Sequence, residues 1–158
     1  METQLIDKID RKILEILQHD STISITEVAE RVNLSTTPCW RRIQRLEQIG
    51  VIRRRVVLLD AAKLNLAVTV LVEIKTSHHT SDWLMRFNDA IAAIPEVVEA
   101  HRMSGHIDYL LKVLVPNIEA YDSVYKRLIA SVELFDVSSS FSMEVLKHTT
   151  EVPLEYSS

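Results

Sequence analysis

The chain has 158 residues, 47% hydrophobic and 25% charged, a composition typical of one folded domain or two small ones. No apolar run approaches the roughly 20 residues of a membrane span, and the charged start METQLIDKIDRK does not resemble a signal peptide. A single cysteine, Cys39, excludes an internal disulfide and fits a reducing cytoplasm, where we expect the protein to act. The two glycines are too few for a phosphate-binding loop.

The net charge of −4 hides an uneven distribution of charge along the chain. Residues 31–55 contain seven arginines and one acidic residue, so this segment carries +6 and the remainder carries −10. Concentrated positive charge is typical of a surface that binds a polyanion, even on an acidic protein. The distribution therefore predicts a polyanionic partner, and together with the helices described next it predicts double-stranded DNA.

The first predicted helix begins at Asp7. Asp10 lies in its first turn, where a carboxylate interacts favourably with the helix dipole. Four apolar residues recur at helical spacing and are expected to face a core: Ile9, Ile13, Ile16 and Leu17. The polar stretch 19–22 ends this helix.

Two short helices joined by a tight turn follow. Ser24 can cap the first of them, and Glu27 can return a hydrogen bond to the Ser24 amide as a capping box. Ser35 or Thr37 can cap the second, and Pro38 falls in its first turn, where a missing N–H has no cost. The three helices together predict a helix-turn-helix unit.

The last helix of this unit, which ends at Gly50, has two different faces. One face is apolar and contains Cys39, Ile43 and Leu46. The opposite face carries Arg41, Arg45 and Gln48, with Arg42 and Gln44 on its flanks. Arginine can bind guanine O6 and N7 in the major groove or bind phosphates, although on one helix alone the pattern also fits an ordinary solvated face.

The chain then becomes rich in β-branched residues, which predicts an extended wing and linker over residues 53–65. The run Arg53–Arg55 is either a solvated strand edge or a set of phosphate contacts, and its position directly after the reading helix favours the second. The DNA-binding domain is therefore expected at residues 1–52. Its predicted DNA contacts are Ser35, Thr36, Thr37, Trp40, Arg41, Arg42, Gln44, Arg45, Arg53 and Arg54. Trp40 either contacts DNA or packs against a neighbouring helix.

Residues 66–158 predict a second domain. Alternation over residues 68–74 indicates a strand, and the elements that follow are a helix, two strands near 97–103 and 107–115, a helix and a strand over 137–146. The order βαββαβ predicts a ferredoxin-like sandwich, and the fold class is α+β. The sheet face away from the helices is expected to carry Leu71, Leu110, Leu114 and Val97, which predicts a dimer.

Four strings of the sequence resemble the Lrp/AsnC family of feast/famine regulators: DKIDRKILEILQHD, VNLSTTPCWRRIQRLEQIGVI, SGHIDYLLKV and SSFSMEVLKHTT. The resemblance covers residues 7–150, and the strings STTPCW, IKTSHH and SSFSME are most similar to its cysteine-responsive branch. It implies a transcription regulator with a DNA-reading domain, a regulatory domain that binds a small amino acid such as cysteine or leucine, and dimers that associate further, commonly into octamers.

The resemblance also implies that the effector binds between dimers, beside the hairpin of Met103, Ser104, Gly105, His106, Asp108 and Tyr109. Gly105 permits close backbone approach, and turn amides can hold a carboxylate while Asp108 binds an ammonium group. His106 stands where the family often has an acidic residue. From the residues alone, Gly105 and Asp108 also fit an ordinary hairpin turn.

Other functions find less support in the sequence. The histidines have no metal-ligand spacing, so we expect no metal or other cofactor, and Cys39 lies on an apolar stripe and is expected to be a core residue rather than a nucleophile or redox sensor. No catalytic triad or paired carboxylates stand out, so we expect no enzyme. An architectural protein that wraps DNA with little sequence preference is the alternative function.

Overall fold

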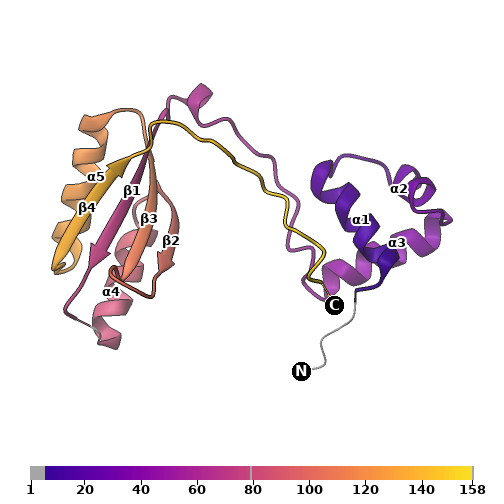
Figure 1. Ribbon diagram of the computed structural model, residues 1–158, viewed down its shortest axis with the longest axis horizontal. Coiled ribbons are helices and arrows are strands. Elements are labelled where there is room, and N and C mark those ends of the chain that lie inside the picture. Colours follow the sequence, from indigo (N-terminus) through magenta and orange to yellow (C-terminus); the bar gives the residue numbers. More distant parts are fainter. Residues whose placement is uncertain (1–5, 79, 158) are drawn as a thin grey trace. The chain divides into compact units, whose positions relative to one another are not determined.

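A computed structural model describes residues 6–78 and 80–157. It divides the chain into two compact units (Figure 1): the first extends to Leu58 and includes the segment from Lys147 onward, and the second is Leu59–Leu146. The expected boundaries place all of 66–158 in the second domain, whereas in the structure the last segment belongs with the first unit. Packing explains the difference, because Leu154 lies against the helical core.

The first unit contains the three expected helices, α1 (Lys8–His19), α2 (Ile25–Arg31) and α3 (Thr36–Gln48). Asp7 caps α1 by accepting hydrogen bonds from the Ile9 and Asp10 amides, and the Asp10 carboxylate accepts one from the Asp7 amide. The buried core is aliphatic and small: Ile13, Leu14, Val28, Ala29, Val32, Cys39, Ile43 and Leu46. Of the predicted α1 stripe, Ile13 is buried, and Ile9, Ile16 and Leu17 are partly buried around this core.

The ends of α2 and α3 agree only in part with the capping predictions. The Ser24 hydroxyl accepts a hydrogen bond from the Glu27 amide at 3.2 Å, but the Glu27 carboxylate binds Arg31 at 2.9 Å, so only half of the predicted capping box is present. Ser35 occupies the N-cap position of α3 without a side-chain capping bond. Gly50 has a positive φ of 77°, a conformation that ends α3 and suits glycine.

Residues 53–60 form no regular secondary structure, so the predicted wing is a stretch of chain without strand pairing among the described residues. A short 3₁₀ helix, Ala62–Leu64, lies within the predicted linker.

The second unit confirms the βαββαβ order. Its elements are β1 (Val68–Lys75), α4 (Ser81–Ala92), β2 (Val97–Arg102), β3 (Tyr109–Val115), α5 (Ile118–Ser131) and β4 (Asp136–Phe141). The sheet has the strand order β2-β3-β1-β4 with antiparallel neighbours (Figure 1). β4 ends earlier than predicted: after the Ser142 amide bonds the Thr69 carbonyl, the chain leaves the sheet and Met143, Val145 and Leu146 are exposed.

Helices α4 and α5 pack on one face of the sheet through a core that includes Trp83, Phe87 and Tyr109. The opposite face carries Leu71, Leu110 and Leu114, as predicted from strand alternation, beside polar residues such as Glu73 and Lys112. The prediction for Val97 is wrong. An irregularity between Val97 and Glu99 shifts the register of β2, so Val97 pairs with buried Val113 and packs against the core.

No helix in the described part of the chain is both long and apolar enough to span a membrane.

Candidate nucleic-acid interface and effector site

Helix α3 is fixed by its apolar face and leaves its other side open. Cys39, Ile43 and Leu46 are buried, and burial raises the pKa of the Cys39 thiol, which fits the predicted core role. The exposed residues near the start of α3 include Ser35, Thr36, Thr37, Trp40 and Arg41. An exposed N-terminal half is what a recognition helix presents to base edges in the major groove.

The arginines of the positive segment fall into two groups that sequence alone does not separate. Four of the seven form ion pairs: Arg31 with Glu27, Arg42 with Asp7 and Asp10, Arg45 with Asp10, and Arg55 with Glu47. The other three, Arg41, Arg53 and Arg54, make no ion pair with any residue that the structure describes. They are therefore the arginines whose charge is available to an external phosphate or base.

Asp10 is the functional residue that the sequence reasoning missed. It is completely buried, and its carboxylate binds Arg42 at 2.8 Å and Arg45 at 2.5 Å. The hydrogen bonds that Arg42 donates to the carboxylates of Asp10 and Asp7 raise the pKa of Arg42. A weak signal was available, since Asp10 stands between Ile9 and Ile13 on the side of α1 that faces the core.

Gln44, the remaining predicted contact on α3, is half-buried and donates a hydrogen bond to Glu47 at 3.0 Å. Glu47 is also the partner of Arg55 at 3.4 Å. The single acidic residue of the positive segment is thus occupied, and Arg53 and Arg54, which directly precede Arg55, are exposed.

The C-terminal segment binds α1. Gln18 forms two hydrogen bonds with the backbone of Val152, at 3.0 and 3.2 Å, and His19 lies 3.1 Å from Glu151. Arg11 donates to the Ser157 carbonyl. These contacts tie the last residues to the helix that carries Asp10.

The predicted effector hairpin connects β2 to β3. Its start is closed by a 2.8 Å hydrogen bond from the Met103 amide to the Asp108 carbonyl, and Ser104, Gly105 and His106 are exposed at its tip. Gly105 has a φ of 131°, so a side chain there would strain the backbone even though the space around it is open.

Asp108 has a structural contact in addition to its predicted role. Its amide bonds the Ile74 carbonyl at 2.9 Å, and one carboxylate oxygen accepts the Thr76 amide at 2.8 Å. The other oxygen accepts no hydrogen bond from the described residues. The ring of Tyr109 belongs to the core, with its centroid 4.6 Å from that of Phe87.

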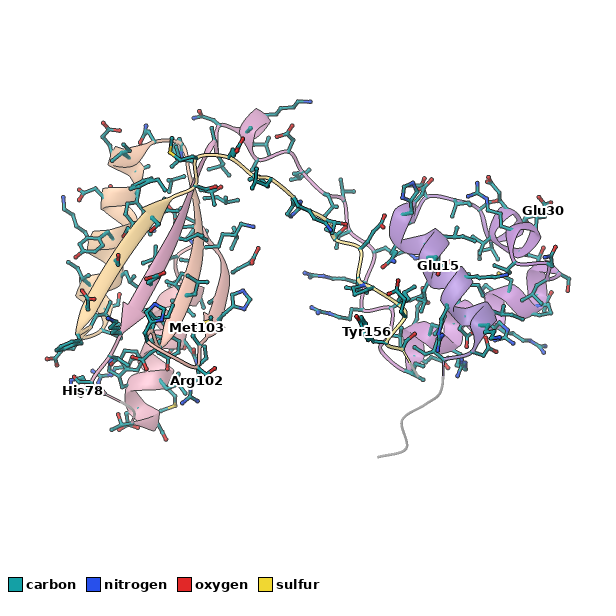
Figure 2. All side chains as sticks on the ribbon, in the orientation of Figure 1. Glu15, Glu30, His78, Arg102, Met103 and Tyr156 are labelled. Carbon is teal, nitrogen blue, oxygen red and sulfur yellow. The ribbon has the colours of Figure 1, made fainter. Side chains whose placement is uncertain are left out.

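A small cavity of about 90 Å³ lies beside the hairpin, lined by Thr80, Ser81, Trp83, Leu84, Arg102 and Tyr109. Figure 2 shows Arg102, Met103 and His78 at the same end of the sheet. Pockets that enclose small ligands usually measure about 300–1,000 Å³, so this cavity alone is smaller than such a pocket. Among the described residues there is no group of three or more side chains that could hold a metal ion.

Similarity to known proteins agrees with this division. The Lrp/AsnC ligand binding domain matches residues 69–152, and a winged helix-turn-helix DNA-binding model matches residues 6–53. The DNA-binding transcriptional activator DecR of Escherichia coli is 50% identical over 152 residues, 96% of this chain and all of DecR.

Solved structures show the same similarity. An AsnC family transcriptional regulator from Agrobacterium tumefaciens has 59% identity and a TM-score of 0.91, covering 95% of this chain and 98% of that one. A transcriptional regulator from Neisseria meningitidis in complex with L-methionine has 33% identity and a TM-score of 0.89, covering 94% of this chain and 97% of that one. The chain therefore belongs to the Lrp/AsnC family of transcriptional regulators.

Proposed function

We propose that this protein is a sequence-specific DNA-binding transcription regulator whose activity responds to a small amino acid. The observation that carries the proposal is the presence, in one chain, of a helix-turn-helix unit with three arginines that form no ion pair among the described residues and a βαββαβ unit with a small cavity beside a glycine hairpin. We place its action in the cytoplasm, where DNA and amino acids are both available and the Cys39 thiol stays reduced.

The DNA interface consists of the exposed start of α3 and the linker. Arg41 is the candidate for base recognition, because it is exposed, forms no ion pair with the residues that the structure describes, and lies two turns or less from the start of the helix. Arg53 and Arg54, which lie in the linker, contact DNA phosphates. The remaining polar and aromatic contacts are Ser35, Thr36, Thr37, Trp40 and Gln44.

The interface assignment predicts two different mutational effects. Arg41→Ala should lose about 1–3 kcal/mol of discrimination, mainly at one operator position. Arg53→Ala or Arg54→Ala should weaken binding to all sequences evenly and reduce the salt slope by about one unit. Binding titrations on an in vitro-selected site and on random DNA of equal length measure both. A wild type without preference for the selected site would instead indicate the architectural, DNA-wrapping function.

The effector site is assigned to the hairpin Met103–Tyr109, with residues contributed by a second dimer. The free carboxylate oxygen of Asp108 binds the ligand ammonium group, and turn amides near Gly105 bind its carboxylate. The side chain of the bound amino acid contacts His106, Met103 and Ser104. The small volume of the cavity in one chain supports a shared site. Cysteine is our first candidate, from the resemblance to the cysteine-responsive branch, and leucine is the second.

Self-association follows from the outer sheet face. Leu71 is 39% exposed, and Leu110 and Leu114 are partly exposed beside it, which leaves an apolar surface for a second copy. We propose a dimer through this face and further association of dimers, commonly into an octamer. Light scattering at micromolar concentration should give a dimer or a multiple of dimers, and a monomer that still bound its operator tightly would contradict the proposal.

Calorimetric titration with each of the twenty amino acids tests the effector assignment. The variant Asp108→Asn suits the test, because its carbonyl oxygen can still accept the Thr76 amide while the charge that binds an ammonium group is lost. We expect one or more amino acids to bind the wild type and not the variant. Asp89→Asn, an exposed position on α4, is the matched control. Equal binding by Asp108→Asn, or no binding by the wild type, would refute this site.

A further inference from the structure

Asp10 holds two arginines of the recognition helix from a position inside the first unit. It is 0% exposed, whereas Arg42 and Arg45 have side chains that are 29% and 37% exposed. One carboxylate oxygen accepts from Arg42; the other accepts from Arg45 and from the Asp7 amide. A buried carboxylate requires such compensation, because its desolvation is costly unless charged partners and hydrogen bonds replace water.

The arrangement fixes α3 relative to α1. Arg42 and Arg45 are three residues apart on α3, so they lie on one side of that helix, and both reach the same carboxylate on α1. Asp7 adds a second acid at 2.6 Å from Arg42. A rotation of α3 about its axis would break both arginine contacts at once.

The same arrangement gives Arg42 and Arg45 acidic partners. Asp7, Asp10, Arg42 and Arg45 together are electrically neutral. Arg41 lies on the exposed side of α3 and forms no ion pair with the described residues. Sequence alone places Arg41 and Arg45 on the same exposed face, but in the structure Arg45 is partly buried against α1.

We infer that Asp10 is a positioning residue of the DNA interface: it withholds Arg42 and Arg45 from DNA and orients α3 so that Arg41 is the arginine presented to it. The inference rests on the DNA-binding part of the proposed function and does not depend on the effector. Arg42 and Arg45, predicted from sequence as DNA contacts, thereby become residues that act through the placement of α3.

The variant Asp10→Asn tests the inference, since it keeps the size of the side chain and removes the negative charge that Arg42 and Arg45 share. On random-sequence DNA, we expect tighter binding and a salt slope steeper by about 0.9 for each arginine that reaches a phosphate. On a site selected in vitro with the wild type, we expect the ratio of specific to random affinity to fall about tenfold or more. A purely structural role would weaken both affinities and leave the slope unchanged.

Glu15→Gln is the matched control. Glu15 is an exposed acid on the same helix, labelled in Figure 2, with no ion pair among the described residues. The variant Glu15→Gln removes one negative charge from the same unit, as Asp10→Asn does. Because Glu15 holds no arginine, this variant should leave the salt slope and the specificity ratio close to those of the wild type. A slope increase in Glu15→Gln equal to that in Asp10→Asn would assign the effect to net charge and overturn the inference.

A second pair of variants, Arg41→Met and Arg45→Met, tests the role of Asp10 even if Asp10→Asn fails to fold. Random DNA lacks the preferred base, so Arg41 contacts a phosphate there, and Arg41→Met should flatten the salt slope on random DNA by about one unit. Arg45→Met should leave this slope unchanged, because Arg45 is already paired with Asp10. Equal flattening by both variants would overturn the inference. If the wild type showed no preference for the selected site, the proposed sequence-specific function would be overturned. The salt slopes of the variants on random DNA would still test whether Asp10 withholds Arg42 and Arg45 from DNA.

Discussion

The two units of this protein are stabilised in different ways. The second has a large buried core built on a sheet, in which the rings of Trp83 and Phe87 stack at 5.0 Å. The first has a small aliphatic core, and it adds a buried acid with two arginines and a C-terminal segment packed against α1. Short helices bury little apolar area, so the first unit depends more on polar contacts that join distant parts of the chain.

The largest expected effect is in the aromatic core of the second unit. Phe87 is 1% exposed and contacts Trp83 and Tyr109, so Phe87→Ala should reduce the free energy of unfolding by about 3–5 kcal/mol. Met85→Ala on the same helix is the control, because Met85 is 59% exposed and its loss should change stability by less than about 0.5 kcal/mol. Chemical denaturation followed by tryptophan fluorescence measures the difference. Similar losses in both variants would show that this core does not dominate the unit.

A smaller effect is expected where the C-terminal segment meets the first unit. Leu154 is partly buried against the helical core, so Leu154→Ala should reduce stability by about 1–2 kcal/mol. Tyr156→Ala, at a neighbouring position that is 87% exposed, should have little effect. Hydrogen exchange of the α1 amides should report faster opening in the first variant only. Unchanged exchange in Leu154→Ala would mean that the helices alone stabilise the first unit.

The smallest effect concerns acid stability. Burial opposes ionisation of Asp7, but hydrogen bonds from the Asp10 amide and Arg42 outweigh it and lower the pKa of Asp7. In the second unit, a hydrogen bond from Lys112 lowers the pKa of Glu99. A lowered folded-state pKa gives stability that is fully present above the unfolded-state pKa and is lost as pH falls through the folded-state pKa. Because both groups are about half exposed, each contribution is small.

Thermal unfolding between pH 6 and pH 2 checks this prediction. Asp7→Asn should reduce the loss of stability on acidification in the first unit, and Glu99→Gln should do so in the second. A pH profile unaffected by Asp7→Asn would show that other carboxylates account for the acid sensitivity of the first unit.

The sequence predicted features that depend on local pattern. Helical spacing placed Ile13, Ile43 and Leu46 in one core, and strand alternation placed Leu71 and Leu110 on the outer face of the sheet. These predictions succeed because helix and strand periods are fixed by backbone geometry.

The features it missed depend on contacts between distant residues. Asp10 meets Arg45 across 35 positions, and no local pattern indicates which arginines an acid so far away will neutralise. The register shift beside Val97 is likewise decided by how β2 pairs with β3. The predicted DNA residues lie on α3 and in the linker, and the predicted effector residues lie in the β2–β3 hairpin, but the contacts that already occupy Arg42, Arg45 and Asp108 could be seen only in the structure.

The C-terminal segment also has a consequence for how the protein is made. Gln18 and Val152 are separated by 134 positions, and Arg11 and Ser157 by 146. During synthesis the three N-terminal helices leave the ribosome long before the residues that complete their unit, and the whole second unit can fold in the interval. The first unit consequently reaches its final stability only after residues 147–157 have been synthesised, so a nascent chain that lacks them would carry an incompletely stabilised DNA-binding unit.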